Sequence, residues 1–323
     1  GIVNCFPIRK MYLLMEKNMN SMWTGRNDGD HPLAQRVFQR VVETEMYGLI
    51  EEGHFALHGF AVDEGVKRNK GRVGAKAAPN IIRKNMSNFP VIQPSLKIFD
   101  FGDVRCDDGD LEYAQNELAD KIKFVLKKGG KSLVLGGGHE VTYAHYSGIK
   151  KAFPDKTIGI INIDAHFDNR EPVNNESTSG TGFYQIAQEG EINSLHIGIQ
   201  KNSNTLLLFD TAHRYGMKYI MADEIYSDNL SDIKSQIDAL FHRVNVVYLT
   251  ICMDTFNASI APGVSALAYN GIFADHSFLS ILQHIVKSKK LVAMDVAEVN
   301  PEFDEQERTA RLAASLLNEW LMI

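Results

Sequence analysis

The stretch TIGIINIDAHFDNR, residues 157–170, decides the fold that we expect for this chain. It begins with an apolar run rich in β-branched residues, 158–163, which is typical of a central strand buried on both faces. Asp164, His166 and Asp168 follow where this strand ends. Open parallel sheets bind ligands at the carboxyl ends of their strands, so two carboxylates and an imidazole at this spacing can converge on one ion. The alternative is a polar loop that caps the next helix, because Asp and His are common in such loops.

The same pattern of short apolar runs separated by longer segments continues on both sides of this stretch. The longer segments have helical apolar spacing, and strands that alternate with such helices indicate right-handed βαβ crossovers. We therefore expect an α/β fold whose parallel sheet is covered on both faces. One more helix is expected after the cap residue Asp30, with an apolar side of Leu33, Val37, Val41 and Val42. The expected strands are 54–60, 96–101, 132–135, 158–163, 195–199, 219–221, 244–252 and 291–296, and the expected helices include 111–126, 206–215 and 230–242.

Composition and charge exclude several classes of protein. The chain has 323 residues, of which 44% are hydrophobic, and this describes a globular protein with a sizeable core, expected as one large domain over residues 23–323. The formal net charge is −6 and the Lys and Arg residues are scattered, so nucleic acid and anionic membranes are not expected partners. No apolar run approaches the roughly 20 residues that are needed to span a bilayer.

The beginning of the chain and its cysteines bear on the compartment. Residues 1–22 are expected to form an N-terminal extension, and the initial Gly in place of Met suggests processing or a residue added for expression. Charged residues interrupt its apolar patch and no cleavage site of small residues follows, so we do not expect a secretory signal. Cys5, Cys106 and Cys252 show no paired spacing, which favours a reducing, cytoplasmic compartment over a disulfide framework.

Two further strand ends carry residues that can bind a metal. The segment SLVLGGGHE, 132–140, is an apolar strand followed by three glycines and His139. The glycines lack the spacing of a phosphate-binding loop, and we expect them to let the backbone turn tightly. The segment VVYLTICMD, 246–254, delivers Cys252 and Asp254 on the same side of a strand. Carboxylates and imidazoles suit Mn²⁺, and two ions roughly 3.5–4 Å apart can acidify a bridging water.

These three motifs together are similar to one family. GGGHE, DAHFD and a strand that ends in Asp before APG resemble the ureohydrolases, the superfamily of arginase, agmatinase and formimidoylglutamase. DVAEVNPEFD at 295–304 resembles its closing segment, so the resemblance covers nearly the whole chain. It implies a three-layer α/β/α fold with a central, mostly parallel, doubly wound sheet, and a homo-oligomer, either a trimer or a hexamer. It also implies an arginase-like catalytic domain over residues 23–323 with two Mn²⁺ ions and a bridging hydroxide.

The resemblance also assigns roles to individual residues. His139, Asp164 and Asp168 would hold one Mn²⁺, and His166 and Asp254 the other, with Asp164 bridging both. His166 and Asp168 are the expected catalytic residues. Asp168 would hold the hydroxide that attacks the substrate and then pass its proton to the leaving nitrogen.

Details of the sequence favour one branch of this superfamily. Phe183 stands where arginases and agmatinases place a histidine, and Asp275 or His276 aligns with a substrate-binding glutamate of arginases. Both differences argue against arginine as the substrate. The implied reaction is hydrolysis of a small molecule, N-formimidoyl-L-glutamate, to L-glutamate and formamide in histidine breakdown. The segments that resemble formimidoylglutamases more than arginases are WTGR at 23–26, VDEGVKRNKGRVGA at 62–75 and SGTGFYQ at 179–185.

The substrate of this branch carries two carboxylates, which basic residues could bind. Arg72 is the first candidate for bidentate recognition, with Arg68 or Lys70 as lesser ones. The alternative is a solvated basic cluster without a specific role. Asn69 could hydrogen-bond the amino acid end. Ser179 and Phe183, from SGTGFYQ, complete the expected substrate-binding set.

Cys252 departs from the superfamily pattern, because most members have an aspartate there that bridges the two metals. A thiolate is a soft ligand, whereas Mn²⁺ prefers oxygen. Cys252 is therefore a working ligand, a defect that leaves a metal-poor site, or an ordinary buried cysteine. The alternatives to formimidoylglutamate hydrolysis are another guanidino or amidino hydrolase, of the agmatinase or arginase type, and a non-catalytic regulatory or assembly subunit.

Overall fold

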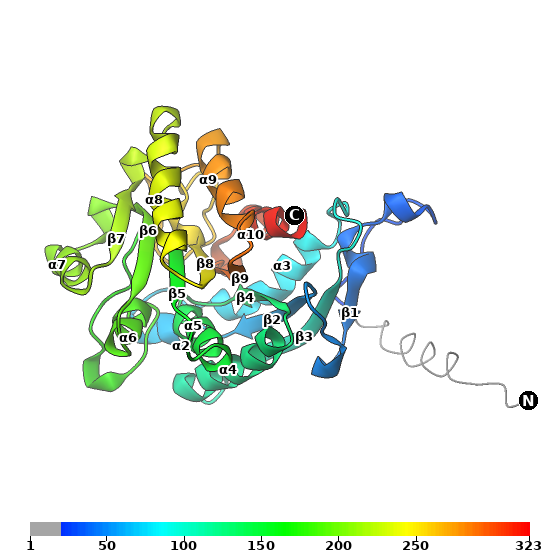
Figure 1. Cartoon of the computed structure of the whole chain (residues 1–323), viewed down its shortest axis with the longest axis horizontal. Coiled ribbons are helices and arrows are strands. Elements are labelled where there is room, and N and C mark those ends of the chain that lie inside the picture. The colour runs from blue at the N-terminus through cyan, green and yellow to red at the C-terminus, as the bar shows by residue number, and fades with distance from the viewer. Residues whose placement is uncertain (1–20) are drawn as a thin grey trace, which may run out of the picture.

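Within residues 21–323, which the computed structural model describes, one sheet of nine parallel strands runs through the molecule (Figure 1). Their order across the sheet is β1-β3-β2-β4-β9-β8-β5-β6-β7. The central strands β4, β5, β8 and β9 are almost entirely buried, as expected for apolar runs covered on both sides. The strands are β1 Val41–Glu43, β2 Phe55–Ala61, β3 Ile98–Arg105, β4 Lys131–Gly136, β5 Ile158–Ile163, β6 Asn193–Ile199, β7 Lys218–Met221, β8 Val246–Cys252 and β9 Leu291–Ala297.

Helices cover both faces of this sheet and complete three layers (Figure 1). One face is covered by α3 Ala78–Met86, α8 Leu230–His242, α9 His276–Val286 and α10 Arg308–Leu321. The other is covered by α4 Leu111–Lys127, α5 Val141–Ala152, α6 Gly182–Gln188 and α7 Leu206–Tyr215, and the short α2 Glu64–Arg68 follows β2. In the described part of the chain, no helix combines the length and the apolar character that crossing a bilayer demands.

The predicted fold class is confirmed, and the bounds of β5, α7 and α8 are those predicted from the sequence. The helix expected after Asp30 is wrong. Two short 3-10 turns, Pro32–Ala34 and Val37–Arg40, lead there into strand β1. Val41 and Val42 pair in parallel with β3, and β-branched residues favour such a strand even where their spacing fits a helix. The expectations for the extension fall on residues 1–20, outside the described residues, apart from its last two.

Strand order brings four polar strand ends together. β4 pairs with β9, β9 with β8, and β8 with β5, always in parallel. Ile163 lies opposite Ile251, and Cys252 lies opposite Ala297. The residues that follow these four strands therefore meet at one edge of the sheet, where open α/β folds bind their ligands.

Candidate metal centre

Each of the four central strands delivers polar side chains to this edge. His139 follows β4, the DAHFD segment follows β5, Cys252 ends β8 two residues before Asp254, and Glu298 follows β9. His139, Cys252, Asp254 and Glu298 are buried. Asp168 and Glu298 have left-handed backbones, with φ of 48° and 70°, which side chains other than glycine adopt only at a cost. The fold thus holds polar and strained residues together at one point.

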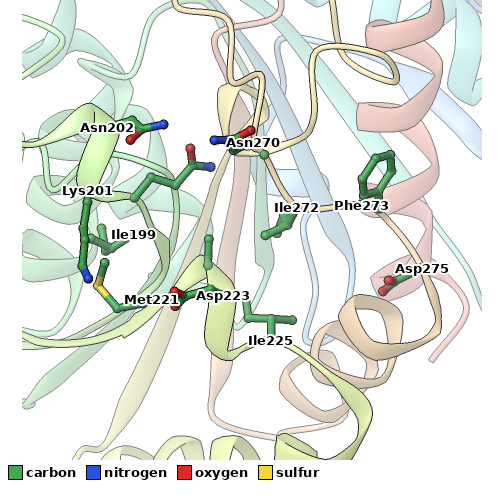
Figure 2. Close-up of a pocket in the computed structure, with 13 residues that line it drawn as sticks. Ile199, Lys201, Asn202, Met221, Asp223, Ile225, Asn270, Ile272, Phe273 and Asp275 are labelled. Atoms are coloured by element: carbon green, nitrogen blue, oxygen red, sulfur yellow. The ribbon is translucent and has the colours of Figure 1, made fainter.

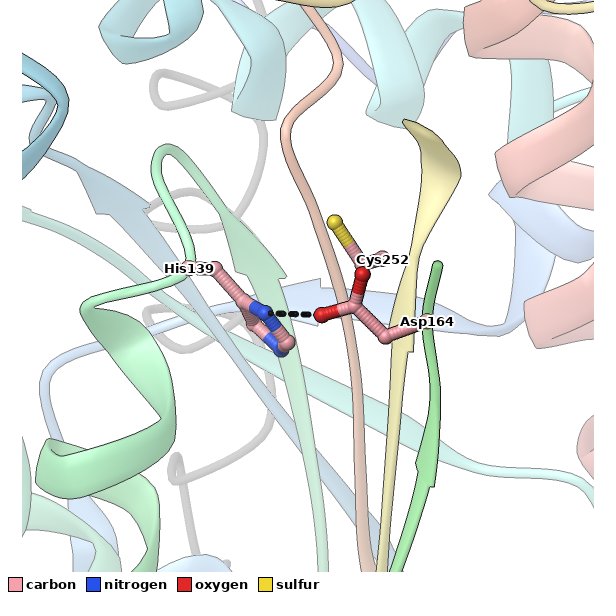
Figure 3. Close-up of side chains that lie close together, drawn as sticks. All are labelled: His139, Asp164 and Cys252. Atoms are coloured by element: carbon pink, nitrogen blue, oxygen red, sulfur yellow. Dashed lines mark ion pairs between the residues drawn. The ribbon is translucent and has the colours of Figure 1, made fainter. Parts of the chain in front are cut away.

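Asp164 lies at the centre of the cluster and faces both imidazoles. Its Oδ2 forms an ion pair with Nδ1 of His139, drawn as a dashed line in Figure 3, and the two atoms are 3.0 Å apart. Its Oδ1 is 3.3 Å from Nδ1 of His166. Nδ1 of His139 is also 2.5 Å from Oδ2 of Asp168, and Nδ1 of His166 is 3.4 Å from Oδ2 of Asp254. Each imidazole is therefore held between two carboxylates, and Asp164 is shared by both groups.

The ligand atoms form two overlapping groups that could each hold a cation. His139, Asp164 and Cys252 offer ligand atoms that lie within 4.8 Å of one another, and so do Asp164, His166 and Asp254. Figure 3 shows Cys252 next to Asp164 and His139. Its Sγ donates to Oδ1 of Asp254 at 2.9 Å. Hard oxygen and nitrogen donors dominate, which fits Mn²⁺, and the thiol is the one soft donor.

Burial and mutual charge shift the pKa values of these groups. Burial opposes the charged form of His139, but hydrogen bonds to Asp164 and Asp168 hold its pKa well above the usual value. Burial also opposes ionisation of Asp164, yet hydrogen bonds from His139 and His166 keep the pKa of this carboxyl below its usual range. Burial and the charge of Asp164 raise the pKa of Asp168 to about 7. They also raise the pKa of the Cys252 thiol. Cations that bind here must therefore replace protons.

The glycines of GGGHE allow close approach of two segments rather than a left-handed turn. None of Gly136, Gly137 and Gly138 has a positive φ. A Cβ on Gly137 would overlap the carbonyl oxygen of Val62, and one on Gly138 would overlap the carboxylate of Glu140. The loop that carries His139 is thus packed tightly against the segment that follows β2.

A cavity of about 100 Å³ opens onto the cluster and contains part of the predicted substrate-binding set. Asn69 and Ser179 line it beside His166 and Asp168. Backbone hydrogen bonds tie both to the same glycine, because Gly65 O accepts from the amides of Asn69 and Ser179 at 2.9 and 3.1 Å. The amide of Gly65 in turn donates to the carboxylate of Glu140. The lining of this cavity is therefore anchored next to His139.

The basic residues predicted to bind substrate point elsewhere. Arg68 pairs with Glu112, and it also donates to the carbonyl oxygens of Gly109 and Ser177. Arg72 donates to the carbonyl oxygens of Val264 and Ser265, and its guanidinium stacks 3.7 Å from the ring centroid of Phe303. Neither lines the cavity, and neither does the exposed Lys70. These assignments are corrected, because the guanidinium groups are already used in holding loops together.

Phe183 does not belong to the cavity either. Its ring is fully buried and packs edge-on against His196, 4.6 Å between centroids. The residue has a structural role, which corrects its place in the substrate-binding set. Its amide donates to the carbonyl oxygen of Asp168 at 2.9 Å, so this packing supports the DAHFD loop.

Asp275 and His276 also lie away from the metal cluster. Asp275 caps α9 by accepting from the amide of Phe278, and His276 is the first residue of that helix. Asp275 lines a separate cavity of about 390 Å³ at the ends of β6 and β7, together with Lys201 and Asp223 (Figure 2). The expected equivalence of Asp275 or His276 with a substrate-binding glutamate is therefore wrong, because neither residue reaches the cluster.

Two ionisable residues of the cavity, Glu298 and Arg170, were not predicted from the sequence. Glu298 lines it, and its Oε1 accepts from the amide of His139 at 2.7 Å. Burial, followed by the charges of Glu140 and Asp254, raises its pKa well above the usual value. Arg170 also lines it, is exposed, and makes no side-chain ion pair or hydrogen bond within residues 21–323. The position of Glu298 after strand β9, matching that of Asp164 after β5, was the available signal.

An adjoining cavity of about 490 Å³ extends this site toward solvent. It shares His166, Arg170 and Leu208 with the smaller cavity and adds the polar side chains of Asn202 and Asn204. Arg170 thus lines both the small cavity at the cluster and the wider cavity beside it, where it can meet the charged part of a small molecule.

The parallel fold and the acid and imidazole centre at its strand ends define a protein of the arginase class, and the chain belongs to the arginase family, whose model matches residues 53–323. It is similar to formimidoylglutamases in particular. The enzyme of Staphylococcus carnosus is 40% identical over 313 residues, 95% of this chain and 100% of the relative. That of Chromobacterium violaceum is 41% identical over 303 residues, 91% and 95% of the two chains.

Solved structures agree with this family. Formimidoylglutamase of Bacillus subtilis superposes with a TM-score of 0.82 over 95% of this chain and 97% of that one, at 22% identity, which shows the fold alone. Formiminoglutamase of Trypanosoma cruzi, solved with Mn²⁺, superposes with a TM-score of 0.76 over 84% and 93% of the chains, at 26% identity. The family resemblance found in the motifs is therefore confirmed.

Proposed function

We propose that this chain is a metal-dependent formimidoylglutamase, which hydrolyses N-formimidoyl-L-glutamate to L-glutamate and formamide. The observation that carries the proposal is a single cavity in which the acid and imidazole cluster lies beside Arg170, whose side chain has no ion-pair partner among the described residues. The curated relatives of this name, 40% and 41% identical over almost the whole chain, support it. A substrate with an amidine at one end and carboxylates at the other matches such a cavity.

The donor set fits two divalent cations. His139, Asp168 and Cys252 would hold one, His166 and Asp254 the other, and Asp164 would bridge them. Mn²⁺ is the proposed ion, because most donors are oxygen or imidazole nitrogen and the T. cruzi relative is solved with it. Cations at this site would supply Lewis-acid activation of a water and of the amidine carbon.

The other residues of the cavity bind and orient the substrate. The amidinium group is cationic, and the buried Glu298 carboxyl faces the cavity where it can accept hydrogen bonds from that group. Arg170 can bind a glutamate carboxylate in bidentate fashion. Asn69 and Ser179 can hydrogen-bond the rest of the amino acid end. Glu298 and Arg170 both line the cavity, so the amidinium end and a carboxylate end of the substrate would each find a partner there.

Proton transfer falls to Asp168, with His166 beside it. The reaction forms a bond between a water oxygen and the formimidoyl carbon and breaks the bond from that carbon to the glutamate nitrogen. Asp168 is half-buried, lines the cavity and can take the water proton. It then delivers this proton to the departing nitrogen, which leaves as the amine of glutamate while formamide keeps the other nitrogen.

We also propose that residues 23–323 form a single catalytic domain, which the one continuous sheet supports. The homo-oligomer and the cytoplasmic location stay predictions from the sequence.

The proposal is tested by metal content and substrate choice together. Reduced protein is reconstituted with Mn²⁺, metal per chain is counted, and formimidoylglutamate, arginine and agmatine are assayed in parallel. We expect two ions per chain and turnover of formimidoylglutamate alone, with D254N as a matched variant that loses one ion. Turnover of arginine or agmatine instead would assign another branch of the family. Absence of both metal and turnover would contradict an enzymatic role.

A further inference from the structure

A buried chain of hydrogen bonds runs from the candidate metal ligand His139 into the core of the sheet. Nε2 of His139 lies 2.9 Å from Oγ1 of Thr250, and this hydroxyl contacts Oδ1 of Asp295. Thr250 of β8 lies directly opposite Asp295 of β9 in the parallel ladder. Both side chains have no exposed surface, so these contacts have no water to replace them.

Asp295 is surrounded by donors on its other oxygen. Tyr248 donates its hydroxyl to Oδ2, and Nδ1 of His145 lies 2.8 Å from the same atom. Burial and the charge of Asp295 hold the pKa of Tyr248 well above its usual value, so its hydroxyl keeps the proton that it donates. Nε2 of His145 pairs with the hydroxyl of Ser132 at 2.9 Å. Three side chains thus supply protons to one carboxylate, which accepts from all of them.

This arrangement decides which nitrogen of His139 carries a proton. The hydroxyl of Thr250 has one proton and gives it to Asp295, so toward His139 it can only accept. Nε2 of His139 must then be the protonated nitrogen. Nδ1, on the other side of the ring, lies between Asp164 and Asp168, and it presents its lone pair to a cation that replaces the proton there.

We propose that Thr250 and Asp295 are positioning residues, which fix the tautomer and the orientation of His139 for metal binding. The inference rests on the proposed metal centre and deepens it. No comparable partner exists within residues 21–323 for Nε2 of His166, the imidazole of the second group. The two metal positions are therefore held unequally, and the chain from His139 to Asp295 supports only one of them.

The test compares variants that interrupt the hydrogen bonds from His139 to Asp295 in different ways. T250V removes the hydroxyl and keeps the side-chain shape, whereas T250S keeps the hydroxyl. D295N places an amide donor against Thr250, whose hydroxyl must then donate to His139 and favour the wrong tautomer. S132A is the matched control, because it removes a buried hydroxyl from the same network without touching this chain. Mn²⁺ affinity at each position is measured by calorimetry, with kcat and KM at saturating metal.

We expect T250V and D295N to lower the Mn²⁺ affinity of one position by about 10- to 100-fold, which is the usual effect of losing a hydrogen-bond partner of a metal ligand. The Mn²⁺ affinity of the other position should not change measurably. kcat should fall with little change in KM. T250S and S132A should bind both ions as the unaltered chain does. The double variant T250V/D295N should bind Mn²⁺ no more weakly than the single variant with the lower affinity, because both changes interrupt the same series of hydrogen bonds.

Opposite results would overturn the inference. These are unaltered affinity in both T250V and D295N, or equal loss at both positions, which marks general misfolding. If the variants do not fold, the unaltered chain with ¹⁵N-labelled histidine and Zn²⁺ as a diamagnetic ion decides. A slowly exchanging proton on Nε2 of His139 is expected there, and a proton on Nδ1 contradicts the inference. Failure of the unaltered chain to bind any metal would instead contradict the proposed function.

Discussion

Cys252 places a thiol where the resemblance to the ureohydrolases implies a bridging carboxylate, and its surroundings define what it can do. The side chain is buried, lines the small cavity and donates to Asp254. Burial, then the charges of Asp164 and Asp254, raises its pKa well above the usual value, so without a metal it is a neutral thiol. A cation beside His139 would favour the thiolate, because coordination replaces the proton.

If Cys252 is a metal ligand, its oxidation must remove both activity and metal. We expect a mild oxidant such as peroxide to lower the bound Mn²⁺ and the activity together, and a thiol reductant to restore both, since a sulfenic acid or mixed disulfide no longer binds the cation. Metal per chain and turnover are measured before oxidation, after it, and after reduction.

Cys106 provides the matched control for this experiment, because it is half-buried and lies outside the metal cavity. C106S should keep the sensitivity to oxidant, whereas C252S should lose it and bind less metal from the start. Metal content that does not respond to thiol oxidation in any of these proteins would show that Cys252 is not a ligand.

Arg170 is the cation that we expect to select a substrate with carboxylates. R170A should raise KM for formimidoylglutamate by about 10- to 100-fold, because a charge-assisted hydrogen bond to a substrate is worth about 1.5–3 kcal/mol. kcat should change little, since Arg170 lies outside the ligand cluster. R170K should recover only part of the loss, because a lysine cannot make the bidentate contact.

The control for Arg170 is another arginine of the same region. Arg68 is paired with Glu112 outside the cavity, so R68A should affect stability more than KM. A similar rise in KM for R68A, or wild-type KM for R170A, would contradict the assignment of Arg170.

At the scale of elements, the loop between β4 and α5 shows how backbone packing supports the site. G137A should destabilise the protein by more than about 1–3 kcal/mol, the usual cost of overpacking, because the added Cβ overlaps a rigid carbonyl oxygen of Val62. It should also lower metal content, because the shift moves His139. Thermal unfolding and metal counting measure both effects.

Gly48 is the matched control for this substitution. It has no atom within 4 Å of an added Cβ and its φ is not positive, so G48A should leave stability and metal content nearly unchanged. Equal melting temperatures for G137A and G48A would show that the loop tolerates a side chain.

The elements that could be predicted from the sequence are those whose signal is local. Apolar β-branched runs indicated the strands. Asp164, His139 and Asp254 stand just after such runs, and we could expect them to lie close together because the strand ends of a parallel sheet share one edge. The same local signal misled at Val41 and Val42. Their helical spacing was outweighed by pairing with β3, a partner more than 50 residues away, which no local pattern reveals.

The parts of the site that were not predicted depend on contacts between distant segments. Arg68 ends α2 and Arg72 lies in the loop that follows it, and only the folded chain shows that Arg68 pairs with Glu112 and that Arg72 donates to two carbonyl oxygens. Thr250 and Asp295 are polar residues inside otherwise apolar strands, a signal that was present in the sequence. What they bind follows from strand register, which the sequence alone does not specify.

At the scale of the whole molecule, burial in the sheet determines the charge of two of its histidines, His58 and His196. Burial lowers the pKa of His58 to about 3, aided by the charges of Lys121, His145 and Arg83, and burial lowers the pKa of His196 to about 3. His58 hydrogen-bonds the hydroxyl of Tyr47 at 2.7 Å and is neutral in the folded protein. The fold therefore depends on groups that bind protons only after unfolding.

The sign of the resulting pH dependence follows from linkage. The unfolded chain titrates these histidines near 6.5, so their contribution is complete above that pH and is lost as the pH falls from 6.5 toward 3. Each histidine adds a slope of about 1.4 kcal/mol per pH unit. H58Q removes one such group, and its free energy of unfolding should fall about 2 kcal/mol less than that of the unaltered chain between pH 7.5 and 5. Urea unfolding followed by tryptophan fluorescence measures this difference. H242Q changes an exposed histidine and should behave as the unaltered chain does, so equal pH dependence in H58Q and H242Q would show that His58 is not held neutral by the fold.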